Sequence, residues 1–96
     1  MRPVSDMSRF YYVYILQSEK DGKWYTGCTS DLRKRFKEHT EEKFKSWTKG
    51  RGPFKLIYYE AYLNKEDAFS REKQIKTGPG RRYTRERLKR FLSLTG

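Results

Sequence analysis

An unbroken run of aromatic and aliphatic side chains, FYYVYIL, occupies positions 10–16 and constrains this chain more than any other feature. Aromatic and β-branched residues favour extended backbone, and a run without polar alternation is typical of a strand buried on both faces. Asp21 and Gly22 then form a reversal signal, and we expect a returning strand over Trp24–Thr26. The opening of the fold is therefore predicted to be a β-hairpin.

A short helix is predicted directly after the hairpin. Gly27 is expected to end the second strand, and the polar residues at positions 29–31 can cap a helix that runs to about Thr40. The apolar positions of this helix, Leu32 and Phe36, are four residues apart and define the face that turns inward.

The rest of the chain supplies a third strand and two further helices. Residues 41–53 are predicted to form a basic loop punctuated by glycine and proline, and strand character returns over Phe54–Leu63. A helix is expected over about 65–76 and is ended by the TGPG sequence at 77–80, and a last helix is expected over about 84–94. This order of elements, β-β-α-β-α-α, predicts an α+β fold.

Length and charge limit the class of protein. A chain of 96 residues has room for one core, so we expect one domain over residues 10–96 behind a loose N-terminal lead at 1–9. Lys and Arg number 23 against 12 Asp and Glu, a net charge of +11, which predicts a polyanionic partner, with nucleic acid favoured over an anionic membrane.

The sequence also excludes several classes of protein. It contains neither a run of about 18 apolar residues nor the apolar core of a signal peptide, so we expect a soluble cytoplasmic or otherwise intracellular protein with no membrane partner. Cys28 is the single cysteine, which excludes an internal disulfide and a zinc site built on paired cysteines.

Glu72 breaks the pattern of its helix. Ala68, Phe69 and Ile75 define the apolar stripe, and at about 100° per residue Glu72 lies near the middle of that stripe. Burying a carboxylate there is unfavourable unless it is paired, opens into a cleft or binds a metal. A structural ion pair with one of the 23 basic side chains remains an alternative to a functional role.

Arg35 and His39 share a helix face through their four-residue spacing. An arginine can grip a phosphate through its planar fork, and a histidine can orient or protonate an oxygen, but a surface arginine and a core histidine fit the pattern as well. Tyr12, Tyr14 and Tyr25 lie on the hairpin, where core packing is the alternative to catalysis. A tyrosine with a pKa near 10 needs nearby cations or a metal-bound water to act as a base.

Taken in order, these residues resemble the GIY-YIG nuclease superfamily, in particular its small stand-alone members. The residues that carry the resemblance are Tyr12-Val13-Tyr14, Tyr25-Thr26-Gly27, Arg35, His39 and Glu72, within about Phe10 to Lys76. Tyr12, Val13 and Thr26 stand where the motifs have glycine, isoleucine and isoleucine. Lys76-Thr77-Gly78 follows where some relatives carry an asparagine beyond the glutamate.

The resemblance implies a small three-stranded antiparallel sheet flanked by helices and metal-dependent cleavage of DNA. It implies that Tyr14 and Tyr25 are the two motif tyrosines, that Arg35 contacts the scissile phosphate, and that Glu72 is the single metal-binding carboxylate. His39 corresponds to a histidine that many relatives use near the tyrosines.

The residues and the resemblance together lead to one hypothesis and one alternative. The hypothesis is a DNA endonuclease, acting in repair, recombination or the processing of structured DNA, with one divalent ion at Glu72, Mg²⁺ or in its place Mn²⁺. Either Tyr14 or Tyr25 accepts the proton of the attacking water, and Arg35 stabilises the charge on the phosphate. The alternative is a non-catalytic basic module that binds DNA or RNA, in which Glu72 is held in an ion pair.

Two basic stretches are expected to hold the nucleic acid, because lysines and arginines can follow phosphates while an aromatic ring stacks on bases. Their residues are Lys43, Lys45, Trp47, Lys49 and Arg51 in the loop, and Arg81, Arg82 and Arg85 further along the chain. We expect a monomer or a weak homodimer, and a body of this size can depend on a protein partner for targeting.

Overall fold

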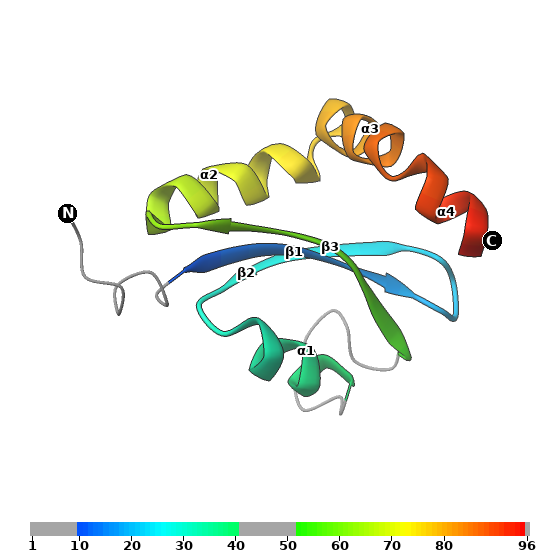
Figure 1. Cartoon of the computed structure of the whole chain (residues 1–96), viewed down its shortest axis with the longest axis horizontal. Helices are drawn as coiled ribbons and strands as arrows, with labels where there is room; N and C mark the ends of the chain where they lie inside the picture. Colours follow the sequence, from blue (N-terminus) through cyan, green and yellow to red (C-terminus); the bar gives the residue numbers. More distant parts are fainter. Residues whose placement is uncertain (1–9, 41–51, 96) are drawn as a thin grey trace.

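A three-stranded antiparallel sheet with helices on both faces forms the fold (Figure 1). The computed structural model describes residues 10–40 and 52–95, without the side chains of His39, Thr40 and Thr95. Its elements are β1 (Tyr11–Ser18), β2 (Trp24–Thr29), α1 (Leu32–Thr40), β3 (Phe54–Tyr62), α2 (Lys65–Lys76), α3 (Gly78–Arg87) and α4 (Lys89–Thr95). The predicted α+β class and helix-flanked sheet are confirmed, with one helix more than expected. Within the described ranges, no helix is long and apolar enough to cross a membrane.

β1 is the central strand of the sheet, in the order β2-β1-β3. Its apolar run is buried on both faces, as predicted, because alternate side chains of a strand point to opposite sides. Val13 and Ile15 pack into one apolar cluster, Tyr14 and Leu16 into another, and all four side chains are at most 3% exposed. β1 therefore joins the two halves of the core.

The turn between β1 and β2 follows the predicted reversal signal. Gly22 has a φ of 74°, a left-handed conformation that glycine adopts without strain. Its N–H donates to the carbonyl of Ser18 (2.8 Å), and a side-chain oxygen of Asp21 accepts from the N–H of Lys23 (2.9 Å). The turn brings β2 alongside β1 in an antiparallel register.

The two helix layers differ in size. Helices α2, α3 and α4 lie over one face of the sheet and α1 over the other (Figure 1). Ala68 and Ile75 of α2 belong to the cluster on the first face, and Leu32 and Phe36 of α1 pack against Phe54 in the cluster on the second. The predicted inward face of α1 is confirmed by these contacts.

The junction between α2 and α3 corrects one prediction. The TGPG sequence at 77–80 ends α2 as expected, but α3 begins within it at Gly78, so a last helix starting near residue 84 is wrong. The hydroxyl of Thr77 donates to the carbonyl of Gln74 (2.6 Å) and accepts from the N–H of Gly80 (3.1 Å), and so caps both helices. A Cβ at Gly80 would overlap the Gln74 carbonyl, so the close junction requires glycine there.

A polar network ties β3 to α2. The carboxylate of Glu60 accepts hydrogen bonds from the hydroxyls of Tyr58 and Tyr62 and from Nε (2.8 Å) and Nη2 (3.2 Å) of Arg71. Burial alone would raise the pKa of Glu60, but the hydrogen bonds from Arg71 and the two tyrosines outweigh it and hold the pKa below its usual value. Glu60 therefore has a structural role, because both of its carboxylate oxygens accept hydrogen bonds from side chains of β3 and α2.

Candidate active site

The hydroxyl of Tyr14 lies over the outer strand β2. Tyr14 pairs with Gly27, and a Cβ built on that glycine would lie 2.5 Å from Cζ of the tyrosine ring. The ring therefore crosses β2 at the one position that has no side chain. β2 continues through Gly27 to Thr29, so the expectation that Gly27 ends the strand is wrong. Its role in the structure is to admit the ring.

Two opposite charges act on this hydroxyl. The pKa of Tyr14 is raised to about 12, mainly because the ring is buried. The positive charge of Arg35 on α1 lowers this pKa, and the negative charge of Glu72 on α2 raises it. Cys28 and Glu38 raise it by smaller amounts. The two helices cover opposite faces of the sheet (Figure 1). Arg35 and Glu72 thus both influence the pKa of Tyr14, although they belong to helices on opposite faces of the sheet.

Glu72 turns toward the sheet, as its spacing predicts. Its side chain is 19% exposed and lies on α2 between the buried Ala68 and Ile75. Phe69 does not share this face, because it is 43% exposed, so the apolar stripe is narrower than expected. The carboxylate Oε2 lies 2.9 Å from Nζ of Lys76, one turn later. Glu72 is therefore turned toward the sheet and held in an ion pair.

Tyr25 lies on β2 two residues before Gly27. It pairs with Leu16 and packs against the cluster on the α1 face, where its ring meets Phe54 edge to face at 5.6 Å between centroids. Tyr25 also lines a groove of about 320 Å³. The groove is lined by Trp24, Tyr25, Thr26, Lys76 and Arg81. This groove leads from the outer strand to the end of α2.

The basic residues expected to hold nucleic acid fall into two groups. Arg81 lines the groove, Arg85 places its guanidinium 4.5 Å from the ring centroid of Trp24, and Arg82 is exposed. The loop residues Lys43, Lys45, Trp47, Lys49 and Arg51 lie outside the described residues. His39 belongs to α1 by its backbone, but its side chain is also outside the description, so its proximity to the tyrosines stays a prediction.

Lys76 was not predicted as a site residue. The signal was present, because a glutamate four residues before a lysine on one helix commonly forms an ion pair. The contact of Lys76 with Glu72 could therefore have been expected, although the place of this lysine in the groove depends on the packing of α2 against β2.

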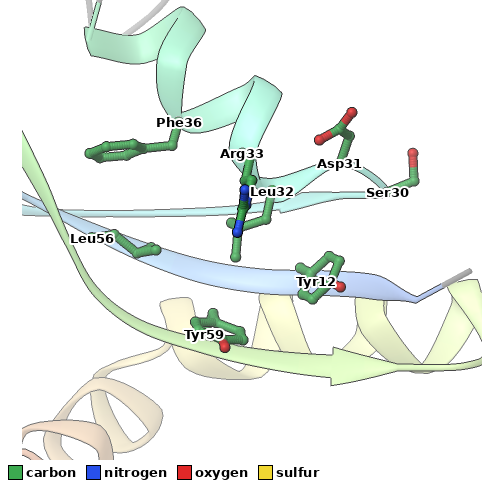
Figure 2. Close-up of a pocket in the computed structure, with 8 residues that line it drawn as sticks. All are labelled: Tyr12, Ser30, Asp31, Leu32, Arg33, Phe36, Leu56 and Tyr59. Atoms are coloured by element: carbon green, nitrogen blue, oxygen red, sulfur yellow. The ribbon is translucent and has the colours of Figure 1, made fainter. Parts of the chain in front are cut away.

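The larger pocket near α1 lies apart from these residues. It has a volume of about 600 Å³ between the first turns of α1 and the strands β1 and β3 (Figure 2). Its lining is Tyr12, Ser30, Asp31, Leu32, Arg33, Phe36, Leu56 and Tyr59. Tyr14, Tyr25, Arg35 and Glu72 do not contribute to it.

The donor set suits a hard cation that keeps most of its water. Among residues 10–40 and 52–95, no group of three or more His, Cys, Asp or Glu side chains could enclose a metal. Glu72 offers one carboxylate, and the ammonium of Lys76 already occupies a cation position 2.9 Å from its oxygen. Mg²⁺ binds in this manner, through one or two carboxylates, water and substrate phosphate. The residues present therefore fit such an ion at Glu72.

Comparisons with known proteins give a matching family model and several similar proteins. Residues 10–87 match the family model described as the GIY-YIG catalytic domain. The chain is 41% identical over 86 residues to the UPF0213 protein BH0048 of Halalkalibacterium halodurans, covering 90% of this chain and 85% of that protein. It is 51% identical over 65 residues to the UPF0213 protein CPE1444 of Clostridium perfringens, covering 68% and 69%. The solution NMR structure of the UPF0213 protein BH0048 from Bacillus halodurans aligns with 91% of this chain and 86% of that chain, at 39% identity and a TM-score of 0.47.

Proposed function

This chain belongs to the GIY-YIG catalytic domain family, and we propose that it is an endonuclease that hydrolyses DNA phosphodiester bonds with one divalent ion. The observation that supports this most directly is the inward-turned carboxylate of Glu72, which is only 19% exposed, together with the opposite influences of Glu72 and Arg35 on the pKa of Tyr14. Phosphodiester hydrolysis needs a group that binds the phosphate and a carboxylate that holds a cation nearby, and this arrangement offers both.

The roles follow from the chemistry of each side chain. Arg35 binds the scissile phosphate through its planar fork and stabilises the negative charge that develops on it. Glu72 holds the ion, Mg²⁺ or Mn²⁺, which when bound supplies Lewis-acid stabilisation of the phosphate oxygens. Lys76 and Arg81 attract the DNA phosphates next to the scissile phosphate into the groove.

Tyr14 is protonated at neutral pH in the free protein. Its pKa of about 12 reflects burial first, and the negative charge of Glu72 adds to it while Arg35 opposes it. A cation at Glu72 would cancel that negative charge and so lower the pKa of Tyr14 toward the range of a base. Tyr14 is accordingly our candidate for accepting the proton of the attacking water, and Tyr25 is the second candidate, beside the groove.

The test is cleavage of plasmid, single-stranded and branched DNA by the purified protein with Mg²⁺ or Mn²⁺. Arg35→Ala and Glu72→Ala should each lower the cleavage rate by about 10²–10³-fold, the usual loss when one charge-stabilising group is removed. Arg33→Ala on α1 and Glu66→Ala on α2 change exposed residues of the same types and should cleave like the unchanged protein. Cleavage no faster than that of Arg35→Ala and Glu72→Ala refutes the proposal.

The ion pair of Glu72 with Lys76 favours the second candidate function, a non-catalytic basic module that binds DNA or RNA. That function predicts binding that weakens with salt, no effect of divalent metal and no cleavage.

Repair, recombination or processing of structured DNA is the cellular role that we propose for the endonuclease. The cleavage assay separates the endonuclease from the non-catalytic module, and its comparison of branched with linear DNA tests the processing of structured DNA.

A further inference from the structure

We propose that Lys76 couples metal binding to DNA binding at Glu72. In the free protein it neutralises the carboxylate, and in the complex it moves to a DNA phosphate and leaves Glu72 to the metal ion. This inference rests on the proposed function. It adds that Lys76 exchanges one partner, the carboxylate of Glu72, for another, a DNA phosphate.

The two side chains of the ion pair differ in how freely they can move. Nζ of Lys76 lies 2.9 Å from Oε2 of Glu72, yet the lysine side chain is 52% exposed and the glutamate side chain only 19%. Lys76 is the last residue of α2, where its flexible four-carbon stem can swing without disturbing the core. The carboxylate therefore stays in place while the ammonium can leave.

The groove gives the ammonium a second place to go. Lys76 lines it together with Arg81 and three consecutive residues of β2, Trp24 to Thr26. Its described lining contains two cationic side chains and no acidic one. A phosphate in this groove would meet Lys76 within the reach of its stem and next to Tyr25. The ammonium thus lies between a carboxylate and a site that suits a phosphate.

A metal ion and Lys76 compete for the same carboxylate. With both cations beside Glu72, their mutual repulsion opposes binding of the metal. A bound phosphate attracts Lys76 away and removes that repulsion, and a bound metal frees Lys76 to hold the phosphate. Because coupling between two ligands is reciprocal, DNA and metal should each strengthen binding of the other, and Lys76 should carry part of that effect.

The first experiment measures Mn²⁺ binding to the DNA-free protein by electron paramagnetic resonance of the free ion. Lys76→Ala should bind Mn²⁺ about two- to fivefold more tightly, the range expected when a partly exposed ion pair is removed. Lys76→Arg keeps the cation, and Lys73→Ala removes an exposed lysine from the same helix, so both should bind like the unchanged protein. Unchanged or weaker Mn²⁺ binding by Lys76→Ala overturns the competition.

The second experiment measures binding of a fluorescently labelled DNA duplex by anisotropy, in EDTA and in Mn²⁺, with a denaturing gel to show that the DNA stays intact. In Lys76→Ala, the slope of log K against log salt should be smaller by about 0.9, the loss of one phosphate contact. Mn²⁺ should also strengthen DNA binding less than it does in the unchanged protein. A salt slope and a Mn²⁺ effect equal to those of the unchanged protein overturn the coupling.

Neither measurement requires cleavage, so the two failures can be told apart. If Glu72→Gln removes Mn²⁺ binding and the protein cuts DNA, but Lys76→Ala behaves like Lys73→Ala, only the coupling is wrong. If Glu72→Gln binds Mn²⁺ as the unchanged protein does, or neither binds it, both the metal site and the coupling are wrong.

Discussion

Replacing Gly27 by alanine tests the position of the Tyr14 ring directly. The added Cβ would lie 3.0 Å from Cε1 and only 2.5 Å from Cζ of that ring, and the second distance is too short for a Cβ contact. The ring is 3% exposed and packed against Leu16 and Phe54, so it cannot move freely away. Either the ring or β2 must shift, and overpacking of this kind costs about 1–3 kcal/mol. Gly27 does not have a positive φ, so the contact alone causes the loss.

The assay is thermal unfolding followed by circular dichroism, together with DNA cleavage. A loss of about 2 kcal/mol lowers Tm by roughly 8–16 °C in a domain of this size. A shift of the Tyr14 hydroxyl by about 1 Å should also lower the cleavage rate about 10²-fold. Gly78→Ala is the matched control, because a Cβ there meets nothing within 4 Å. It should leave Tm and cleavage nearly unchanged.

A double-mutant cycle isolates the contact. In a Tyr14→Ala background the ring is gone, so Gly27→Ala should no longer destabilise the protein, although cleavage is already lost. If Gly27→Ala alone keeps the Tm and activity of the unchanged protein, the ring does not cross β2 as described. If its cost persists without the ring, the contact is not the cause.

Three further outcomes are expected. Because burial raises the pKa of Tyr14 to about 12, its ionised fraction is small at neutral pH and grows as the pH rises, so cleavage should increase from pH 7 to 9; an identical profile for Tyr14→Phe would assign the proton to another group. Glu60→Gln should lower the free energy of unfolding at pH 7 by about 1–3 kcal/mol in urea titrations. Because the pKa of Glu60 is lowered by folding, its stabilisation is complete above the unfolded pKa and disappears as pH falls through the folded value, so Glu60→Gln should unfold with a weaker acid dependence. Thr77→Ala should cost about 0.5–2 kcal/mol in the same titrations, and equal stability would contradict the shared cap.

The sequence predicted those features that depend on local patterns. The apolar run of β1, the Asp21-Gly22 turn and the spacing of Leu32 and Phe36 each specify an element through a few adjacent residues. The start of α2 is marked locally by Asn64, whose side chain accepts from the N–H of Asp67 as an N-terminal cap (3.0 Å), and its end by the TGPG sequence. These signals act over about one turn of chain and do not require knowledge of the packing.

Other features depend on contacts between distant segments. The TGPG sequence signals a helix end, but only the shared cap of Thr77 shows that another helix starts at once. Gly27 reads as a strand end until the ring of Tyr14 is seen to need the space. The inward turn of Glu72 could be read from periodicity, whereas its influence on Tyr14 of β1 and the place of Lys76 in the groove follow from the packing of α2 on the sheet.

The place of the candidate site on an outer strand has a consequence for self-association. Within the described residues β2 has a neighbouring strand on one side only, so its other edge presents unpaired backbone donors and acceptors. Such an edge can add a strand from a second molecule. A dimer formed by extending the sheet there would cover the groove beside Tyr25. Strand pairing between copies and DNA binding would therefore exclude each other at this edge, and bound DNA would protect β2 from pairing with a second molecule.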